Sequence, residues 1–203
     1  MLSQVLFAAS YGFAAAVQPG QLQAYLISRA VAHGWRRTLP AVLAPLLSDV
    51  PVIVLVFLAL TRLPPLFLTL LRLAGGAFLM YLAYGALKAG REGGRSMEAP
   101  APAHRTFLEA VAVNLLNPNP YLGWALVLGP LVLQAWTASA ASGIAVLAAF
   151  YLTLVAGSSA IVVLFALARS LGPRVAAWLV RASAVALAAF GAWQLWAGLA
   201  AFR

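Results

Sequence analysis

Long, nearly uncharged apolar stretches constrain this chain more than any other feature of its sequence. A helix needs about 20 mostly apolar residues to cross a bilayer. Six stretches reach that length, at Leu2–Ser28, Thr38–Leu60, Leu66–Leu87, Phe107–Trp136, Ala138–Leu167 and Val175–Ala201. They are continuous and rich in Leu and Ala, whereas transmembrane strands are about ten residues long and alternate in polarity. The sequence therefore predicts an all-α integral membrane protein with six transmembrane helices.

The balance of charged and apolar residues argues against a soluble domain. Of the 203 residues, 64% are hydrophobic and 8% are charged, against about half and a quarter in soluble proteins. The net charge of +9 first suggests nucleic acid, but the basic residues lie between the apolar stretches and form no stripe with aromatic side chains. We therefore expect membrane lipid as a partner and no nucleic acid. Without cysteine, and with two isolated histidines, the chain is predicted to bind no metal or cofactor.

The basic residues also predict the orientation of the chain, because Lys and Arg are enriched in the cytoplasmic loops of membrane proteins. The first, third and fifth connections hold most of them: Arg29, Arg36, Arg37, Lys88, Arg91, Arg95, Arg105, Arg169, Arg174 and Arg181. We therefore expect these connections in the cytoplasm and both termini outside. No Lys or Arg precedes the first apolar stretch, so we expect it to remain as a span rather than to be removed as a signal peptide.

The third connection divides the chain into two groups of three helices. It is rich in Gly, Pro and charge, which indicates a linker. We place it at residues 88–106, between a first repeat at 1–87 and a second at 107–203. Because each group holds an odd number of helices, related halves must have opposite orientations, as in the inverted repeats of secondary transporters. Polar side chains at equal spacing support this relation: Gln18, Gln21 and Tyr25 in the first helix, and Asn114, Asn117 and Tyr121 in the fourth.

Both of these helices contain prolines in their interior. A proline leaves the carbonyl four residues earlier without its donor, which lipid tolerates only where protein or water supplies a substitute. We therefore expect broken helices at Gln18-Pro19-Gly20-Gln21 and at Asn117-Pro118-Asn119-Pro120. Broken helices at matching places point to the central site of a transporter. The predicted substrate pathway comprises Gln18, Pro19, Gly20, Gln21, Asn114, Asn117, Pro118, Asn119 and Tyr121. Kinks that serve packing alone are the alternative.

Asp49 is the one acidic residue well inside an apolar stretch. An ionised carboxylate at membrane depth costs about 3 kcal/mol on insertion scales, so it should face a partner or a cavity, or be protonated. Amides and hydroxyls do not titrate in the relevant range, which makes Asp49 the predicted group for proton coupling. A structural carboxylate, hydrogen-bonded to neighbouring backbone or to Ser48, is the alternative.

Four motifs of the chain resemble the LysE/RhtB family of amino-acid exporters. They are Gln18-Pro19-Gly20-Gln21, Leu47-Ser48-Asp49-Val50, the segment from Gly75-Gly76 to Tyr81-Leu82 and, most specifically, Asn114 to Tyr121. The likeness covers nearly the whole chain. It implies export of amino acids or similar small solutes from the bacterial cytoplasm across the cell membrane, driven by a proton or ion gradient. The family pattern in the first helix reads Gly-Pro followed by an amide, whereas this chain has Pro19-Gly20-Gln21, which leaves the substrate open.

Two other functional classes are alternatives to a transporter. An enzyme is not expected, because the chain lacks a His-Glu-x-x-His motif, a cysteine and a pair of intramembrane carboxylates. A channel, or a structural membrane protein without gradient-coupled transport, stays an alternative, since a pore also tolerates irregular backbone. Small residues at Gly75-Gly76 and at 182–189 would permit packing of a homodimer.

Overall fold

The computed structural model describes residues 1–59, 65–91, 102–168 and 171–201. In the first half, α1 (Leu2–Val17) and α2 (Gln21–His33) precede the short α3 (Trp35–Thr38), the 3-10 turn η1 (Leu39–Leu43), α4 (Ala44–Ala59) and α5 (Pro65–Arg91). In the second half, α6 (Ala103–Leu115), α7 (Pro118–Gly123), the π-helical turn η2 (Trp124–Leu128) and α8 (Gly129–Ala138) precede α9 (Ala140–Ala168) and α10 (Pro173–Ala200). Most of the expected linker, with Arg95, and also Arg169 lie outside the described residues.

Five segments of the described chain are long and apolar enough to cross a membrane, which makes this a multi-pass membrane protein. They are Trp35–Leu58, Thr69–Lys88, Pro118–Ala138, Ala140–Ala168 and Arg174–Ala200. The first of the six expected spans is instead divided into the apolar α1 and the more polar α2. The 16 residues of α1 extend over about 24 Å, less than the ~30 Å of a bilayer core. The fourth expected stretch is likewise divided, and its apolar span begins only at Pro118.

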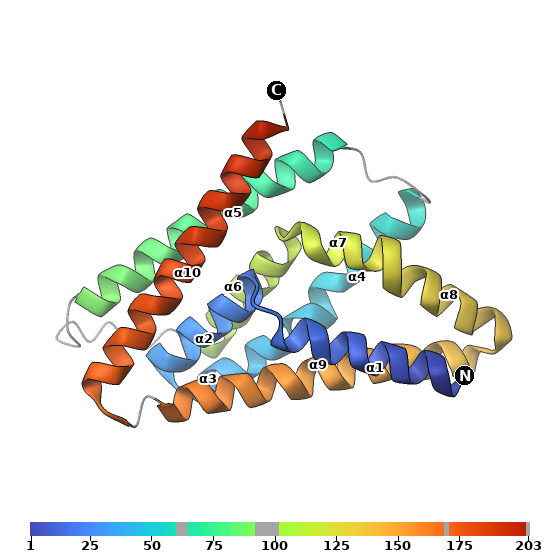
Figure 1. Cartoon of the computed structure of the whole chain (residues 1–203), viewed down its shortest axis with the longest axis horizontal. Coiled ribbons are helices and arrows are strands. Elements are labelled where there is room, and N and C mark those ends of the chain that lie inside the picture. Colours follow the sequence, from blue (N-terminus) through green and yellow to red (C-terminus); the bar gives the residue numbers. More distant parts are fainter. Residues whose placement is uncertain (60–64, 92–101, 169–170, 202–203) are drawn as a thin grey trace.

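Helices from opposite halves of the chain pack against each other. α1 and α2 follow one another along α9, and α5 lies along α10 (Figure 1). α4 and η1 of the first half contact α6 of the second half. The C-terminal ends of α2, α5 and α9 lie toward one end of the molecule, and the N-terminus and the α8–α9 connection lie at the other (Figure 1). These three helix ends lead into the connections that carry most of the basic residues, so those connections begin on the same side of the molecule.

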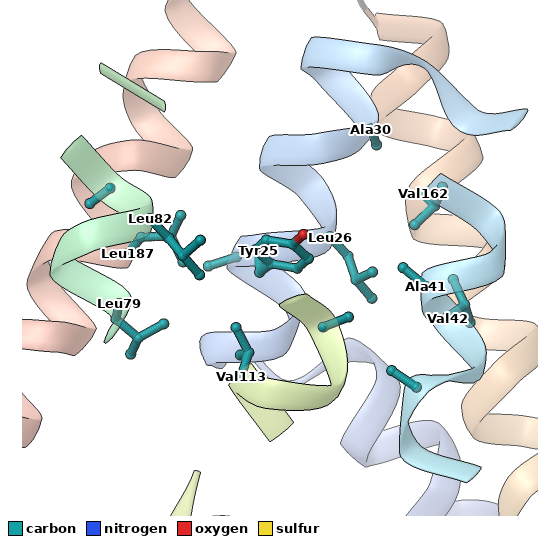
Figure 2. Close-up of a cluster of buried hydrophobic side chains, with 14 residues drawn as sticks. Tyr25, Leu26, Ala30, Ala41, Val42, Leu79, Leu82, Val113, Val162 and Leu187 are labelled. Carbon is teal, nitrogen blue, oxygen red and sulfur yellow. The ribbon is translucent and has the colours of Figure 1, made fainter. Parts of the chain in front are cut away.

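Two clusters of buried apolar side chains hold these helices together. The first surrounds α2, with side chains from α5 and α10 on one side and from η1 and α9 on the other (Figure 2). The second joins α1, α4, α7, η2, α8 and α9, and its largest members are Trp124, Tyr121 and Phe150. Each cluster combines residues of both halves, so the halves form a common interior rather than two separate ones.

Gly75 and Gly76 allow α5 to approach its neighbours closely. A Cβ atom at Gly75 would overlap the carbonyl oxygen of Leu116, and one at Gly76 would lie 2.8 Å from the carbonyl oxygen of Gly191. Both glycines are buried, and Ser183, Ala184 and Leu187 of the stretch 182–189 are buried as well. Gly75, Gly76 and these three residues therefore serve packing within the chain, whereas Ala182, Val185 and Ala189 of the same stretch are exposed.

Replacing Gly75 with alanine is expected to destabilise the protein by about 1–3 kcal/mol, because the new methyl group meets backbone that cannot rotate away. Gly85→Ala is the matched control in the same helix, since no other part of the described chain lies within 4 Å of its Cβ position. Alanine there should be neutral or should stabilise by up to about 1 kcal/mol. Thermal unfolding in detergent measures both effects, and equal midpoints for the two variants would contradict this packing.

Candidate functional site

The first expected interruption lies between α1 and α2. Gln18 ends α1 in an extended conformation (φ −61°, ψ 126°), and Gly20 precedes α2 in a second extended conformation (φ −156°, ψ 176°). Pro19 lies between them and has no N–H to continue the helix. The first turn of α2 therefore begins inside the protein, with the backbone N–H groups of its first turn free of intrahelical partners.

The second interruption lies between α6 and α7, at Asn117. This residue is extended (φ −88°, ψ 125°), and its side-chain oxygen accepts a hydrogen bond from the backbone N–H of Asn119 at 3.0 Å. Asn117 thus caps α7, and Pro118 occupies the first helical position, where its missing N–H and fixed φ are favourable. The hydroxyl of Tyr121 donates to the carbonyl of Leu115 at 3.0 Å, so one side chain of α7 satisfies a carbonyl that the break leaves free.

A cavity of about 140 Å³ lies between the two interruptions. Its polar lining consists of amides, one carboxylate and two aromatic polar groups: Gln18, Gln21, Gln23, Asp49, Asn114, Asn117, Asn119, Tyr11 and Trp124. Gly20 and Pro120 also line it. The structure therefore brings seven of the ten residues predicted for the pathway and for coupling to one cavity, and these come from both halves of the chain. Pro19, Pro118 and Tyr121 do not line it.

Asp49 lies in α4 at the wall of this cavity and is 4% exposed. One carboxylate oxygen accepts from the side-chain amide of Asn114 at 3.0 Å, and the other accepts from the Tyr151 hydroxyl at 2.9 Å and from the Trp124 indole at 3.3 Å. Three donors from α6, η2 and α9 thus converge on one carboxylate. Such bonds offset the cost of burying a charge. Asp49 therefore has both the polar partners and the cavity that its charge was predicted to need.

Asn114 connects this carboxylate to its neighbour in α4. The amide nitrogen of Asn114 also donates to the hydroxyl of Ser48 at 2.8 Å, and Ser48 in turn donates to the carbonyl of Ala44 at 3.0 Å. Ser48 was one possible partner of Asp49 in the alternative of a structural carboxylate, but its hydroxyl instead bonds to the amide that holds Asp49. This chain of bonds fixes α6 against α4 immediately before the second interruption.

Gln21 and Gln23 present unused hydrogen-bonding atoms in this region. They are 4% and 6% exposed. Their Oε1 atoms have no hydrogen-bond partner among the described residues, although the amide nitrogen of Gln23 donates to Ser158 at 3.1 Å. A buried acceptor without a donor costs about 1–3 kcal/mol. Both residues line the cavity, but these two oxygens are themselves out of reach of a water-sized molecule inside it.

Tyr25 does not share the cavity with Gln18 and Gln21, although the sequence placed the three on one face. Its hydroxyl donates to a carboxylate oxygen of Glu109 at 2.7 Å and accepts from Arg29 at 3.2 Å. Glu109 also forms ion pairs with Arg29 and, at 3.0 Å, with Arg105. This charged network joins α2 to α6, and the sequence analysis did not predict it. The spacing of Arg105 and Glu109, four residues apart on one helix, was its available signal.

Four polar lining or supporting residues were also missed: Tyr11, Gln23, Trp124 and Tyr151. Tyr151 and Ser158 lie seven residues apart in α9, a spacing that places them on one helical face, and they contact Asp49 and Gln23 respectively. Polar groups at this spacing in an otherwise apolar helix were therefore a usable signal.

The cavity is weakly charged. Among the described residues that line it, none is Lys, Arg or His, and Asp49 is the sole carboxylate. Its remaining wall is apolar and includes Leu22, Leu128, Phe150 and Leu154. The arrangement can hold a small polar solute by hydrogen bonds and by contact with apolar side chains.

A comparison with protein families identifies most of the chain. Residues 13–198 match the family model described as LysE type translocator. No curated protein and no solved structure matches the chain significantly. The matched range includes both helix interruptions, the charged network and the lining residues of the cavity other than Tyr11.

Proposed function

The chain belongs to the LysE type translocator family, and from this premise we propose that it is a secondary transporter that exports amino acids or similar small solutes from the cytoplasm. The observation that carries the proposal is the convergence of both helix interruptions on one amide-lined cavity. Irregular backbone at membrane depth is tolerated where it lines a cavity, and transporters bind their substrates at such places. A proton or ion gradient supplies the energy for export.

In this proposal six of the amide and glycine residues that line the cavity contact the solute: Gln18, Gly20, Gln21, Asn114, Asn117 and Asn119. Pro19 and Pro118 act indirectly, because they set the two interruptions that expose backbone groups. Tyr121 also acts indirectly, since its hydroxyl holds the carbonyl of Leu115. Asp49 is the group that binds and releases the coupling proton.

The proposed architecture has six membrane crossings in two inverted repeats, at 1–87 and 107–203, with α1 and α2 together forming the first crossing. The contacts between helices support it. The first helices of each half pack on the middle helices of the other, α1 and α2 on α9, and α6 on α4, while the last helices, α5 and α10, pack on each other. A two-fold relation in the membrane plane produces this reciprocal pattern.

Transport by purified protein in proteoliposomes tests the function. We expect saturable flux of at least one labelled amino acid, accelerated exchange when unlabelled substrate is present on the far side, and accumulation driven by an imposed proton gradient. A channel would give flux without exchange or accumulation. Gln21→Ala should reduce the flux, and Gln134→Ala is the matched control, since Gln134 is an exposed amide in α8 away from the cavity.

The proposed orientation places both termini outside and the basic connections in the cytoplasm. The natural chain has no cysteine, so single cysteines report their own position. An impermeant maleimide added to intact cells should label Ala138→Cys, at the end of α8, and should label Arg36→Cys only after the membrane is permeabilised. Labelling of position 36 in intact cells would contradict this orientation.

A further inference from the structure

The second interruption leaves one backbone carbonyl without a donor. The hydroxyl of Tyr121 satisfies the carbonyl of Leu115, but the next carbonyl, that of Leu116, has no such partner among the described residues. In an uninterrupted helix it would accept from residue 120, and Pro120 has no N–H to offer. Leu116 does not line the cavity, so a donor for this oxygen must come from the protein around it.

An amide without a partner lies in α10. Gln194 is 0% exposed, and neither its Nε2 nor its Oε1 atom has a hydrogen-bond partner in the part of the chain that the structure describes. Such burial is unfavourable, because the amide has given up its bonds to water and received none in return. An apolar side chain of the same size would fill this place without that cost, so the amide needs a reason to be there.

The two unpartnered groups lie next to each other. A Cβ atom at Gly75 in α5 would overlap the carbonyl oxygen of Leu116 and would lie 2.9 Å from Oε1 of Gln194. Because Gly75 has no side chain, Gln194 of α10 can reach past α5 to the break between α6 and α7. Two acceptor oxygens cannot bond to each other, but a half-turn of the amide exchanges Oε1 for the donor Nε2. This terminal torsion of glutamine is only weakly restricted.

We propose that Gln194 is a positioning residue, whose amide nitrogen donates to the carbonyl of Leu116 and thereby holds the second interruption in place. That carbonyl belongs to the same planar peptide unit as the backbone N–H of Asn117, which donates to the carbonyl of Asn114 at 3.2 Å. The bond from Gln194 fixes the other edge of this unit. Asn117 caps α7 and lines the cavity, whereas Gln194 does not line it. Gln194 therefore acts on the solute through Asn117, a role that rests on the proposed transport function.

Gln194→Met tests the hydrogen bond by thermal unfolding of the full-length protein in detergent. Methionine is close to glutamine in size but carries no donor. If Gln194 bonds to Leu116, the variant leaves a buried carbonyl unpaired, and the unfolding midpoint should fall by about 3–10 °C. An unchanged or higher midpoint would show that the amide has no partner and would overturn the proposal. Gln134→Met is the control at an exposed amide of α8, and its midpoint should stay within about 2 °C of the natural protein.

Flux in proteoliposomes tests the positioning role. The probe is whichever of labelled alanine, leucine, lysine and glutamate the natural protein transports fastest. Gln194→Met should raise the concentration for half-maximal flux by about 2- to 10-fold, the equivalent of one hydrogen bond. Asn117→Ala should raise it as well, and adding Gln194→Met to Asn117→Ala should raise it no further, because both changes act through Asn117. An unchanged concentration for Gln194→Met, or effects that multiply in the double variant, would show that Gln194 serves packing alone.

Gln194→Glu separates the donor from the size of the side chain. A buried carboxyl group stays protonated and then carries one O–H donor, so at pH 6 this variant should keep the half-saturation concentration of the natural protein. A rise equal to that of Gln194→Met would contradict the proposal, and this comparison decides the question if the methionine variant does not fold. Absence of flux in the natural protein would contradict the transport function and the positioning role with it. A lowered unfolding midpoint of Gln194→Met would in that case still establish the hydrogen bond.

Discussion

Replacing Asp49 with asparagine is expected to abolish accumulation of solute against a gradient. Exchange of solute across the membrane should continue. A coupled exporter needs a group whose charge changes during its cycle, and the amides and hydroxyls of the cavity do not titrate in the relevant range. Asparagine keeps the shape of the side chain and one acceptor for Tyr151 and Trp124. The protein should therefore still bind solute but equilibrate it, and the flux should no longer depend on pH. Counterflow and proton-driven uptake, measured on the same proteoliposomes, give the two results.

Tyr151→Phe is the control for a purely structural role of this carboxylate. It removes one of the three donors to Asp49 but keeps the group that titrates. If Asp49 only anchors the surrounding helices, both variants should lower thermal stability and both should retain proton-driven accumulation. Undiminished accumulation by well-folded Asp49→Asn would refute the coupling role.

An exchange of positions between the carboxylate and its amide partner sharpens this experiment. In Asp49→Asn with Asn114→Asp, the pair that meets at 3.0 Å still contains one carboxylate and one amide. If coupling requires a titrating group in this cavity, the double variant should regain some proton-driven accumulation that the single variant lacks. Additive loss in the double variant would show that the position of the carboxylate is essential.

Glu109→Gln is expected to give the second large effect, a loss of about 1–3 kcal/mol in the free energy of unfolding. Glu109 faces two arginines and the hydroxyl of Tyr25, and its side chain is 14% exposed. Without the carboxylate, Arg29, whose side chain is 23% exposed, is left with a charge that has no counter-charge. Breaking a buried pair costs about 3–5 kcal/mol, and the partial exposure of Arg29 reduces this figure.

Arg105→Gln provides the comparison, because it removes an ion pair of the same carboxylate at a side chain that is 60% exposed. An exposed pair contributes about 0–1 kcal/mol, so this variant should unfold close to the natural protein. The double variant Arg29→Gln with Glu109→Gln should be less destabilised than the sum of the two single variants, since it leaves no unpaired charge behind. Equal unfolding midpoints for Glu109→Gln and Arg105→Gln would contradict this assignment.

The prolines made the interruptions predictable, but they also explain why two tyrosines were misplaced. The spacing of Gln18, Gln21 and Tyr25 defines one face only if a single helix runs through all three. The helix in fact begins at Gln21, so Gln18 belongs to another segment and its direction is unrelated to that of Tyr25. Tyr121 is likewise separated from Asn114 by the break at Asn117. Helical periodicity carries across a sequence only as far as the helix itself.

The partners of Asp49 were less predictable for a second reason. Trp124 begins a π-helical turn, in which hydrogen bonds span five residues instead of four and the facing of later side chains is shifted. No pattern in the sequence marked this turn. The cost of a charge at membrane depth made it predictable that Asp49 would need polar partners. Which aromatic donors reach it depends on how α4, η2 and α9 pack.

The cross-pairing of helices means that the two halves of this chain are complements rather than modules. α1 finds its main partner in α9, and α5 finds its own in α10, so a fragment that ends in the linker would expose the surfaces that the other fragment covers. The covalent link keeps the two halves close together and in equal number. The contacts between helix faces determine how the halves pack. Close contact of Gly76 with Gly191 further ties α5 to α10 as one unit. Any rearrangement that opens the cavity must therefore divide the molecule between helix pairs and not between its N-terminal and C-terminal halves.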